Sequence, residues 1–483
     1  MTNSTSLASP APRVVIIGGG LAGLAAAEFL VGDAGPPACR VTLVEPAGRC
    51  GGVLGTGNPD GWLIERSADC FLAARPEGIA LVERLGLERE LVGVDPRVRR
   101  ALVWHRGRTI PVPHGFRLLA PGRLTGILGS PLLSPAGKLR VLAEWFIPPR
   151  RGGEEESLQE FAIRRLGREA FERLVQPLAA GIWTADPAKL GMVSACTEFV
   201  ALEQEQGSLW AGERARLAKT SAAGEATGAR YGQFVSFAGG METLPRRLLE
   251  HVQGRGVDIV TGRAERLVRD GTGWLVTVGR SEADRSPDVL AADAVVVATP
   301  PPAAAVLLAA VDPAIAAELA GIACAGSVIV SLGWRRESVA HPLDAAGLVV
   351  PHAAGRRAFA VSFSSSKFPG RAPAGCVLMR VFLGGALDPE VMAFDDDALV
   401  TLARREVADL LGASGEPLVV QIDRWAGAMP QYHVGHAARI NRIETALALH
   451  PGLALAGAAY RGVGIPQVIA SGRAAAERSL RPA

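Results

Sequence analysis

Hydrophobic residues dominate positions 14–31, VVIIGGGLAGLAAAEFLV, and the only charge in this stretch is Glu28. Length and polarity alone are compatible with a membrane-spanning helix. The internal order is different, because a β-branched run at 14–17 precedes a cluster of glycines and an Ala/Leu-rich run follows at 24–30. This order predicts a short strand, a tight turn and a helix. A membrane span does not need it, so we expect the segment to bind a ligand.

Three glycines of the turn, Gly18, Gly20 and Gly23, complete the spacing G-x-G-x-x-G. Without side chains the backbone can turn sharply and bring its N–H groups against a pyrophosphate. Leu21 and Ala22, at the start of the helix, are expected to bind the cofactor with these glycines. The pyrophosphate then lies at the positive end of the helix dipole. The spacing therefore predicts a dinucleotide-binding turn.

A second strand, CRVTLVEP, ends in Glu45, where an acidic residue can bind ribose hydroxyls. Strand, helix, strand and acidic residue in this order predict a Rossmann-like domain of the α/β class. Arg49, Gly51 and Gly52 follow, and then two short runs around a turn at residues 58–61. This segment is similar to the E…R-x-G-G element of FAD-dependent amine oxidases, in which the loop lies along the cofactor phosphates. The resemblance favours FAD over NAD.

Two later segments extend the same predicted domain. Residues 255–300 predict a strand, a hairpin that turns at 270–273, and a buried strand ending at Thr299. In the resembling flavoproteins, the backbone around the position of Val260 meets the adenine.

The C-terminal segment GLALAGAAYRGVGIPQVIASGRAAAE predicts a strand at 453–456 and a helix that starts near Pro466. Such a helix start directs the positive end of its dipole at its neighbour. In resembling flavoproteins this end points at the flavin N1/C2=O region, where it stabilises the anionic reduced ring. The cofactor-binding residues expected here are Gly457, Val463, Gly464 and Ile465.

Composition narrows the class of protein. The chain has 483 residues, enough for two or three domains, and it is 48% hydrophobic with a net charge of only +3, which argues against general nucleic-acid binding. Its six cysteines are far apart and lack metal-binding spacing, and residues 1–12 lack the features of a signal peptide. We expect a cytoplasmic protein without a metal site.

Phrases along residues 13–477 are similar to those of the oxygen-dependent protoporphyrinogen oxidase family. They include PLAAGIWTADPAKLGM, FVSFAGGMETLP, SSSKFPGRAPAGCVLMRVFLGG, RWAGAMPQYHVGH and AAYRGVGIP. The sequence departs from the family at Ser67, Cys70 and Ala458, which affects fine contacts to flavin and substrate. Because residues 457–460 contain no cysteine, noncovalent FAD is expected.

The resemblance implies oxidation of protoporphyrinogen IX to protoporphyrin IX in haem biosynthesis. Hydride passes from a meso carbon to flavin N5 with loss of an N–H proton, three times, and O2 reoxidises the flavin with release of three H2O2. Binding and orientation carry most of this chemistry. We assign no catalytic side chain, and we expect His433 and His436 to serve loop structure.

Substrate recognition is expected in a basic stretch, because residues 96–143 contain nine Arg or Lys and no acidic residue. Arginine suits the propionate carboxylates of a porphyrinogen. The resemblance assigns Arg100 to a propionate and places the backbone of Gly181 near the macrocycle; a solvated arginine and a helix C-cap are the alternatives. Apolar positions expected mainly in the core, with cavity lining as the alternative, are Leu348, Phe363 and Leu383.

Three parts are expected. A discontinuous FAD-binding domain comprises 13–90, 233–300 and 421–483, and an α+β substrate domain comprises 301–420. Residues 91–232 predict a helical, arginine-rich subdomain that ends in a flexible loop at 221–232. Within it, LTGILGSPLLSPAGKLRVLAEWFIPP mixes apolar and basic residues. This stretch predicts either peripheral contact with the cytoplasmic membrane or a cover for the pocket.

Several alternatives remain open at the level of sequence. Within the family, the reaction can be coproporphyrinogen III to coproporphyrin III oxidation, since the two substrates differ in propionates or vinyls at two positions. A different enzyme class is an FAD amine oxidase or carotenoid-type desaturase. A nonenzymatic alternative is a membrane-associated protein that retains FAD only structurally.

Overall fold

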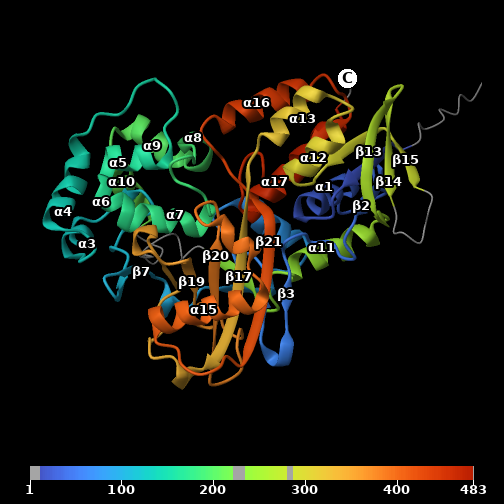
Figure 1. The fold of residues 1–483 in the computed structure, drawn as a ribbon. Coiled ribbons are helices and arrows are strands. Elements are labelled where there is room, and N and C mark those ends of the chain that lie inside the picture. The colour runs from blue at the N-terminus through green and yellow to red at the C-terminus, as the bar shows by residue number, and fades with distance from the viewer. Residues whose placement is uncertain (1–10, 221–233, 280–286, 482–483) are drawn as a thin grey trace, which may run out of the picture.

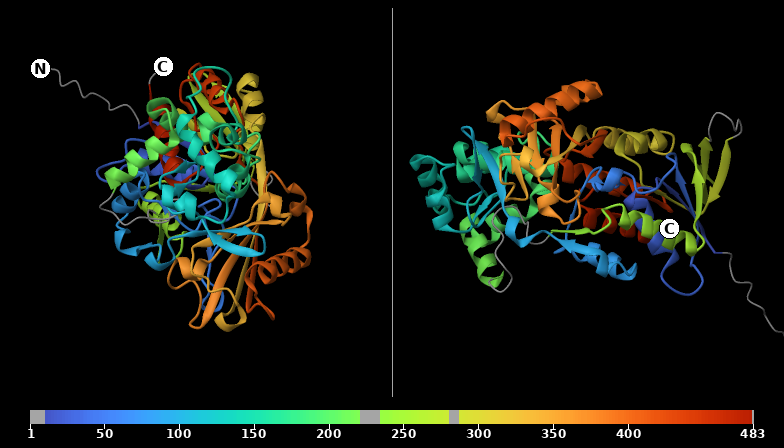
Figure 2. Two further views of the ribbon diagram at one scale, coloured as in Figure 1. Left: turned by 90° about the vertical axis from the view of Figure 1, so that its left-hand side faces the viewer. Right: turned by 90° about the horizontal axis from the view of Figure 1, so that it is seen from below.

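The computed structural model describes residues 11–220, 234–279 and 287–481. The loop predicted at 221–232 lies outside the described residues. The described chain forms three regions in a row, with a helical region at one end, a strand–helix region at the other and a long twisted sheet between them (Figures 1 and 2).

A five-stranded sheet in the order β12-β2-β1-β16-β22 forms the first region, and all its neighbouring strands are parallel. Val14–Ile17 are buried because helices cover one face and strands and helices the other. The strands are β1 (Arg13–Ile17), β2 (Arg40–Glu45), β12 (Asp258–Thr261), β16 (Ala294–Val297) and β22 (Leu453–Leu455). The Rossmann-like α/β prediction for this region is confirmed.

One face of this sheet packs on α1 (Leu21–Val31), α11 (Thr243–Gly254) and α17 (Ile465–Ser479). The other face packs on a three-stranded sheet, β13 (Arg263–Asp270), β14 (Gly273–Gly279) and β15 (Asp288–Ala292), and on α12 (Pro301–Leu308), α13 (Pro313–Ala320) and α16 (His436–Leu447). Residues 14–31 are therefore a strand and an 11-residue helix. None of the described helices is long and apolar enough to cross a bilayer.

The central sheet has seven strands in the order β21-β17-β20-β19-β18-β7-β8. It takes strands from the expected segments 91–232, 301–420 and 421–483, so it joins pieces that were expected in three different parts of the protein. The strands are β7 (Ala101–His105), β8 (Arg108–Pro111), β17 (Cys324–Arg335), β18 (Gly347–Val349), β19 (Ala358–Ser362), β20 (Cys376–Gly384) and β21 (Val419–Pro430). Helix α15 (Asp396–Leu411) packs on one face.

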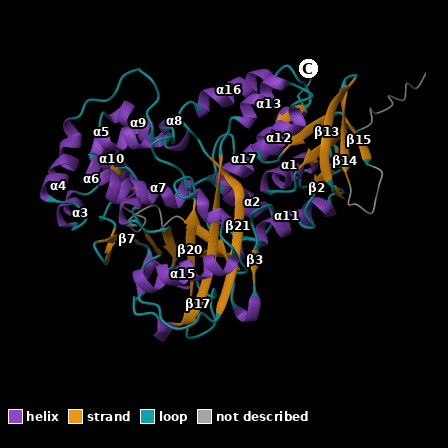
Figure 3. Ribbon diagram, in the orientation of Figure 1, coloured by secondary structure: helices purple, strands orange, loops and turns teal. Residues whose placement is uncertain are grey.

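Helices dominate residues 124–220 (Figure 3). They are α3 (Leu124–Gly129), α4 (Pro135–Leu142), α5 (Leu158–Leu166), α6 (Arg168–Ala170), α7 (Gln176–Trp183), α8 (Met192–Ala195), α9 (Thr197–Gln206) and α10 (Leu209–Thr220). Helix α5 begins at a capping box formed by Ser157 and Glu160 and ends at Gly167, whose φ of +90° stops the helix. The segment expected to be helical, 91–232, therefore differs from the prediction in its first part, because β7 and β8 join the central sheet.

Short elements connect the three regions. The strand pair β3 (Thr56–Gly57) and β4 (Ile64–Glu65) encloses the turn predicted at 58–61. Strands β5 (Phe71–Leu72), β6 (Leu91–Gly93) and β11 (Phe234–Phe237) form a small antiparallel sheet, and α2 (Pro76–Arg84) and α14 (Ser364–Lys367) complete the set.

Helices α1 and α17 approach each other closely where Gly472 meets Ala22. A Cβ at Gly472 would lie 2.3 Å from the Ala22 carbonyl oxygen. We expect Gly472→Val to lower the free energy of unfolding by about 3 kcal/mol, because the backbone of a buried helix cannot move aside. Urea unfolding measures this loss. Gly129→Ala is the control, because a Cβ at this helix end would meet no atom of the described chain within 4 Å, and equal stability of the two variants would contradict the proposed packing.

Candidate active site

The glycine turn between β1 and α1 contains two kinds of glycine. A Cβ at Gly23 would lie 1.9 Å from the Gly18 carbonyl oxygen, and Gly18 itself has a φ of +111°. These two glycines are required by the protein's own backbone. A Cβ at Gly20, in contrast, would meet only the Gly52 Cα among the described residues, at 4.0 Å. The space over Gly20 is therefore open to a ligand.

Glu45, at the end of β2, shapes this turn. Its carboxylate accepts hydrogen bonds from the backbone N–H groups of Gly19 at 2.7 Å and Ala47 at 2.8 Å. Val260 lies beside it, because β12 pairs with β2 and places Val260 opposite Val44. The expected ribose and adenine residues thus share one edge of the sheet.

Arg49 organises the next loop. Its guanidinium donates to the carbonyl oxygens of Gly52 at 2.7 Å and Leu54 at 2.9 Å. The Gly51 N–H donates to the Gly19 carbonyl oxygen at 2.8 Å and so joins this loop to the glycine turn. The R-x-G-G segment and the G-x-G-x-x-G turn, about 30 residues apart in sequence, form one backbone surface.

The cofactor-binding residues expected in the C-terminal segment lie just before and at the start of α17. Gly457 follows β22 with a φ of +140°, and Gly464 is the N-cap residue before Ile465, without a side-chain cap. Val463 packs against the apolar core of the helical region, a cluster that includes Trp183. This segment therefore connects the parallel sheet to the helical region.

The two helix starts and their surroundings suit a dinucleotide. Gly20 caps α1 without a side chain, as Gly464 does for α17, so N–H groups at both helix ends remain available for an anionic ligand. Two buried hydroxyls beside them, Thr299 Oγ1 and Tyr460 Oη, have no hydrogen-bond partner in the described part of the chain. Open backbone, positive helix ends and orphaned donors fit the phosphates and polar edges of FAD.

Arg100 and Gly181 lie near the two ends of β18. The Arg100 carbonyl oxygen accepts from Ala346 N–H, and a Cβ at Gly181 would meet Val349 at 3.9 Å. Three residues along a strand separate the two contacts by about 10 Å. Gly181 lies within α7, whose C-cap is Thr184, so it is not a helix C-cap.

The arginines of the basic stretch have separate partners. Arg100 forms an ion pair with Asp344, and its Nε donates to the Asp344 carbonyl oxygen at 2.9 Å. Arg117 is buried against Glu213, and Arg140 donates to backbone carbonyl oxygens of residues 163–165. Arg117 and Arg140 therefore stabilise the helical region, and the side chain of Arg100 is more exposed than that of Arg117.

The apolar positions expected mainly in the core, Leu348, Phe363 and Leu383, lie on the sheet face that packs on α15. That expectation is confirmed. The opposite face of β19 and β20 presents the partly exposed rings of Phe359 and Phe382, with centroids 6.1 Å apart. Strand alternation would have identified Phe382, which is one residue out of phase with Leu383. It would have missed Phe359, which is four residues from Phe363 and reaches this face because the register of β19 shifts between Ala358 and Ala360.

A buried charge cluster accompanies the departures from the family at Ser67 and Cys70. Lys367 Nζ lies 2.9 Å from the Asp69 carboxylate and 3.3 Å from Cys70 Sγ, and Arg380 donates to the Ser67 carbonyl oxygen. Burial opposes ionisation of Asp69, yet the charges of Lys367 and Arg380 lower its pKa. Burial, followed by the Asp69 charge, raises the pKa of Cys70 to about 12. No sequence signal links these distant positions.

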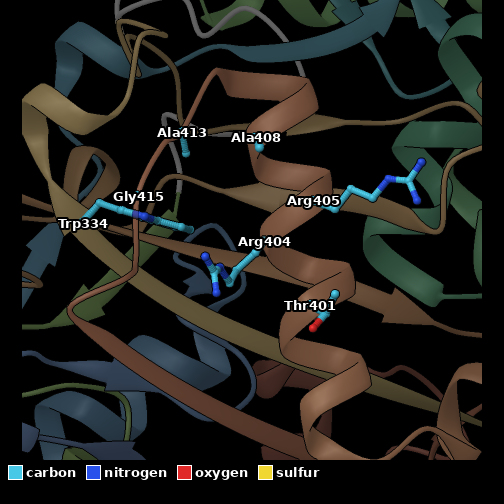
Figure 4. A pocket seen from close by; sticks show the side chains of 7 residues that line it. All are labelled: Trp334, Thr401, Arg404, Arg405, Ala408, Ala413 and Gly415. Carbon is cyan, nitrogen blue, oxygen red and sulfur yellow. The ribbon is translucent and has the colours of Figure 1, made fainter.

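A hollow of about 430 Å³ lies away from these residues, between α15 and the end of β17. In Figure 4, Arg404 and Arg405 extend from opposite sides of the helix and do not converge on one point. The lining residues are Trp334, Thr401, Arg404, Arg405, Ala408, Ala413 and Gly415.

Comparison with known proteins places this geometry in a class. The family model described as flavin containing amine oxidoreductase matches residues 21–480. The chain belongs to this family, and its cofactor is FAD.

Individual relatives are similar over almost the whole chain. Coproporphyrinogen III oxidase of Bacillus subtilis (strain 168) is 32% identical over 97% of this chain and 98% of its own length. Chloroplastic protoporphyrinogen oxidase of Nicotiana tabacum is 29% identical over 90% of this chain and 78% of its own length. A crystal structure from Exiguobacterium sp. 255-15 with a provisional protoporphyrinogen oxidase name has a TM-score of 0.83, 29% identity and coverage of 96% and 98%.

Gly20 offers a direct test of the cofactor site. We expect Gly20→Val to fold but to lose bound FAD, because its side chain would enter the space that the protein's own atoms leave open. Flavin absorbance of the purified variant and its circular dichroism measure the two effects. Gly23→Ala is the contrast, since its Cβ collides with backbone and should lower the yield of folded protein. A fully flavin-loaded Gly20→Val variant would refute the assignment.

Proposed function

We propose that this protein oxidises a porphyrinogen to its porphyrin with FAD and O2, and that coproporphyrinogen III is the substrate. The observation that carries the proposal is the 32% identity to a coproporphyrinogen III oxidase across 98% of that relative, together with an intact FAD cradle. Protoporphyrinogen IX is the second candidate, because the tobacco relative is 29% identical.

When bound, FAD supplies the acceptor for two electrons at a time, and O2 restores it. The residues of this chain bind and orient the reactants. The glycine turn and the loop held by Arg49 would carry the phosphates, and the start of α17 would place its positive end at the flavin. FAD would be held noncovalently, since residues 457–460 contain no cysteine.

On the substrate side, the face that carries Phe359 and Phe382 would support the macrocycle, with Gly181 on the neighbouring helix. A glycine there leaves room for a flat ring, because its Cβ would have no contact closer than 3.9 Å. Arg100 would bind a propionate carboxylate. The parallel sheet would serve FAD binding and the seven-stranded sheet substrate binding.

Porphyrin fluorescence tests the reaction directly. Purified protein in air, given coproporphyrinogen III or protoporphyrinogen IX in parallel, should form fluorescent porphyrin faster than the spontaneous rate. We expect the higher kcat/KM with coproporphyrinogen III. The opposite preference would favour the second candidate, and no porphyrin from either substrate by a flavin-loaded enzyme would reject both.

Arg100→Ala should raise KM about 10- to 100-fold with little change in kcat, because one charge-assisted contact to a carboxylate is lost. Steady-state kinetics on the preferred porphyrinogen measure the effect. Arg97→Ala is the matched control, since Arg97 is exposed and pairs with Asp95 two residues away. Equal KM values for the two variants would remove Arg100 from the substrate site.

The helical region would also contact a membrane surface peripherally. Exposed apolar side chains gather in its segment 124–146, with Phe146 84% and Leu139 68% exposed. Lys138 lies in the same segment and would favour an anionic surface. Such contact would bring a poorly water-soluble porphyrin ring close to the site.

Sedimentation with vesicles tests this contact. The protein should bind vesicles containing phosphatidylglycerol more strongly than vesicles of phosphatidylcholine alone, and Leu139→Ser/Phe146→Ser should reduce binding at least about fivefold, since two apolar side chains leave the interface. Leu449→Ser, at an exposed leucine after α16, is the control. Equal binding of both variants, or none by the parent protein, would refute the contact.

A further inference from the structure

The loop between β22 and α17, residues 456–464, has an unusual backbone. Gly457 and Gly462 have φ values of +140° and +144°, a conformation that other residues rarely adopt. The Gly457 N–H donates to Ser471 Oγ at 3.0 Å. Several further polar groups of this loop also depend on side chains from outside it.

Tyr432 supplies two of these contacts with one hydroxyl. Its Oη donates to the Ala458 carbonyl oxygen at 2.6 Å and accepts from the Gly462 N–H at 2.7 Å. The hydroxyl therefore bridges two loop positions four residues apart. Both distances are typical of well-formed hydrogen bonds.

The ring of Tyr432 cannot easily move. It is 2% exposed and stacks on His436, with centroids 4.1 Å apart and planes 12° from parallel. His436 Nε2 lies 3.3 Å from the Tyr460 carbonyl oxygen, which can only accept, so Nε2 carries the proton. Burial lowers the pKa of His436 to about 4, which keeps the ring neutral near pH 7.

Tyr432 follows the last strand of the central sheet, and its neighbour links the loop to the helical region. The side-chain amide of Gln431 donates to the Trp183 carbonyl oxygen, at the end of the helix that carries Gly181, at 3.3 Å. The segment 431–436 thus contacts the loop expected at the flavin and the helix expected at the substrate.

We propose that Tyr432 is a positioning residue for the flavin: its hydroxyl holds the loop 457–464 in the shape that binds FAD. Without it, the Ala458 carbonyl and the Gly462 N–H lose a shared partner at the start of α17. His436 supports this role by fixing the ring. The proposal rests on the FAD assignment and is independent of which porphyrinogen is oxidised.

Tyr432→Phe keeps the ring and its stacking and removes only the hydroxyl. We expect FAD to dissociate from the diluted holoenzyme about 10- to 100-fold faster, followed by the fluorescence of released flavin. The visible absorbance and circular dichroism of the remaining bound flavin should also shift, because the loop beside the ring has moved. Neither readout depends on porphyrinogen turnover.

Ser130→Ala is the matched control. Ser130 is buried in the helical region, and its hydroxyl accepts from the Leu132 N–H at 3.2 Å, so the variant also loses a buried contact to backbone. It should lower stability without changing FAD release or the flavin spectrum. If Tyr432→Phe behaves as Ser130→Ala does, the tyrosine is merely structural and the proposal is overturned.

Hydrogen exchange on the unmodified holoenzyme provides a second test if Tyr432→Phe does not fold. The peptide covering 457–464 should exchange as slowly as the buried part of α17, since the Gly462 N–H is bonded to Tyr432 Oη. Exchange of this peptide at the rate of an exposed loop would overturn the proposal.

Discussion

The close backbone approach at the glycine turn is the constraint on which the rest of the site depends. Gly23 must pass within van der Waals range of the Gly18 carbonyl, and α17 must pass equally close to α1 at Gly472. Because no side chain separates these segments, α1 and α17 can both begin beside the same parallel sheet. Neither helix start has a capping side chain. Their positive ends make this edge suitable for an anionic cofactor.

Once this edge exists, the other predicted residues have structural reasons for their positions. Glu45 and Arg49 hydrogen-bond backbone around the turn, so each stabilises the cradle itself. Glu45 and Arg49, which the binding motif requires, therefore also stabilise the local backbone.

The central sheet separates two environments. Along β20, alternation places Leu383 in the core and Phe382 on the opposite, partly exposed side. In β19, a register shift between Ala358 and Ala360 brings Phe359 to that same side, whereas Phe363 is core. The charges follow the same division, with Arg380 directed away from the core towards Asp69 and Lys367. This side of the sheet therefore combines two partly exposed aromatic rings with a buried charge cluster.

Local sequence determined the strand–turn–helix of residues 13–31, the acidic end of β2 and the helix start at Ile465, because glycine spacing and hydrophobic periodicity act over short distances. Tertiary structure alone decided the pairing of Arg100 with Asp344, the Asp69–Lys367–Arg380 cluster and the contacts of Tyr432. Apart from the stacking of Tyr432 on His436, the oppositely charged or hydrogen-bonded partners lie between 26 and 311 residues apart in the chain. Side-chain contacts over such separations depend on how complete sheets and helices pack, and no local pattern encodes that packing.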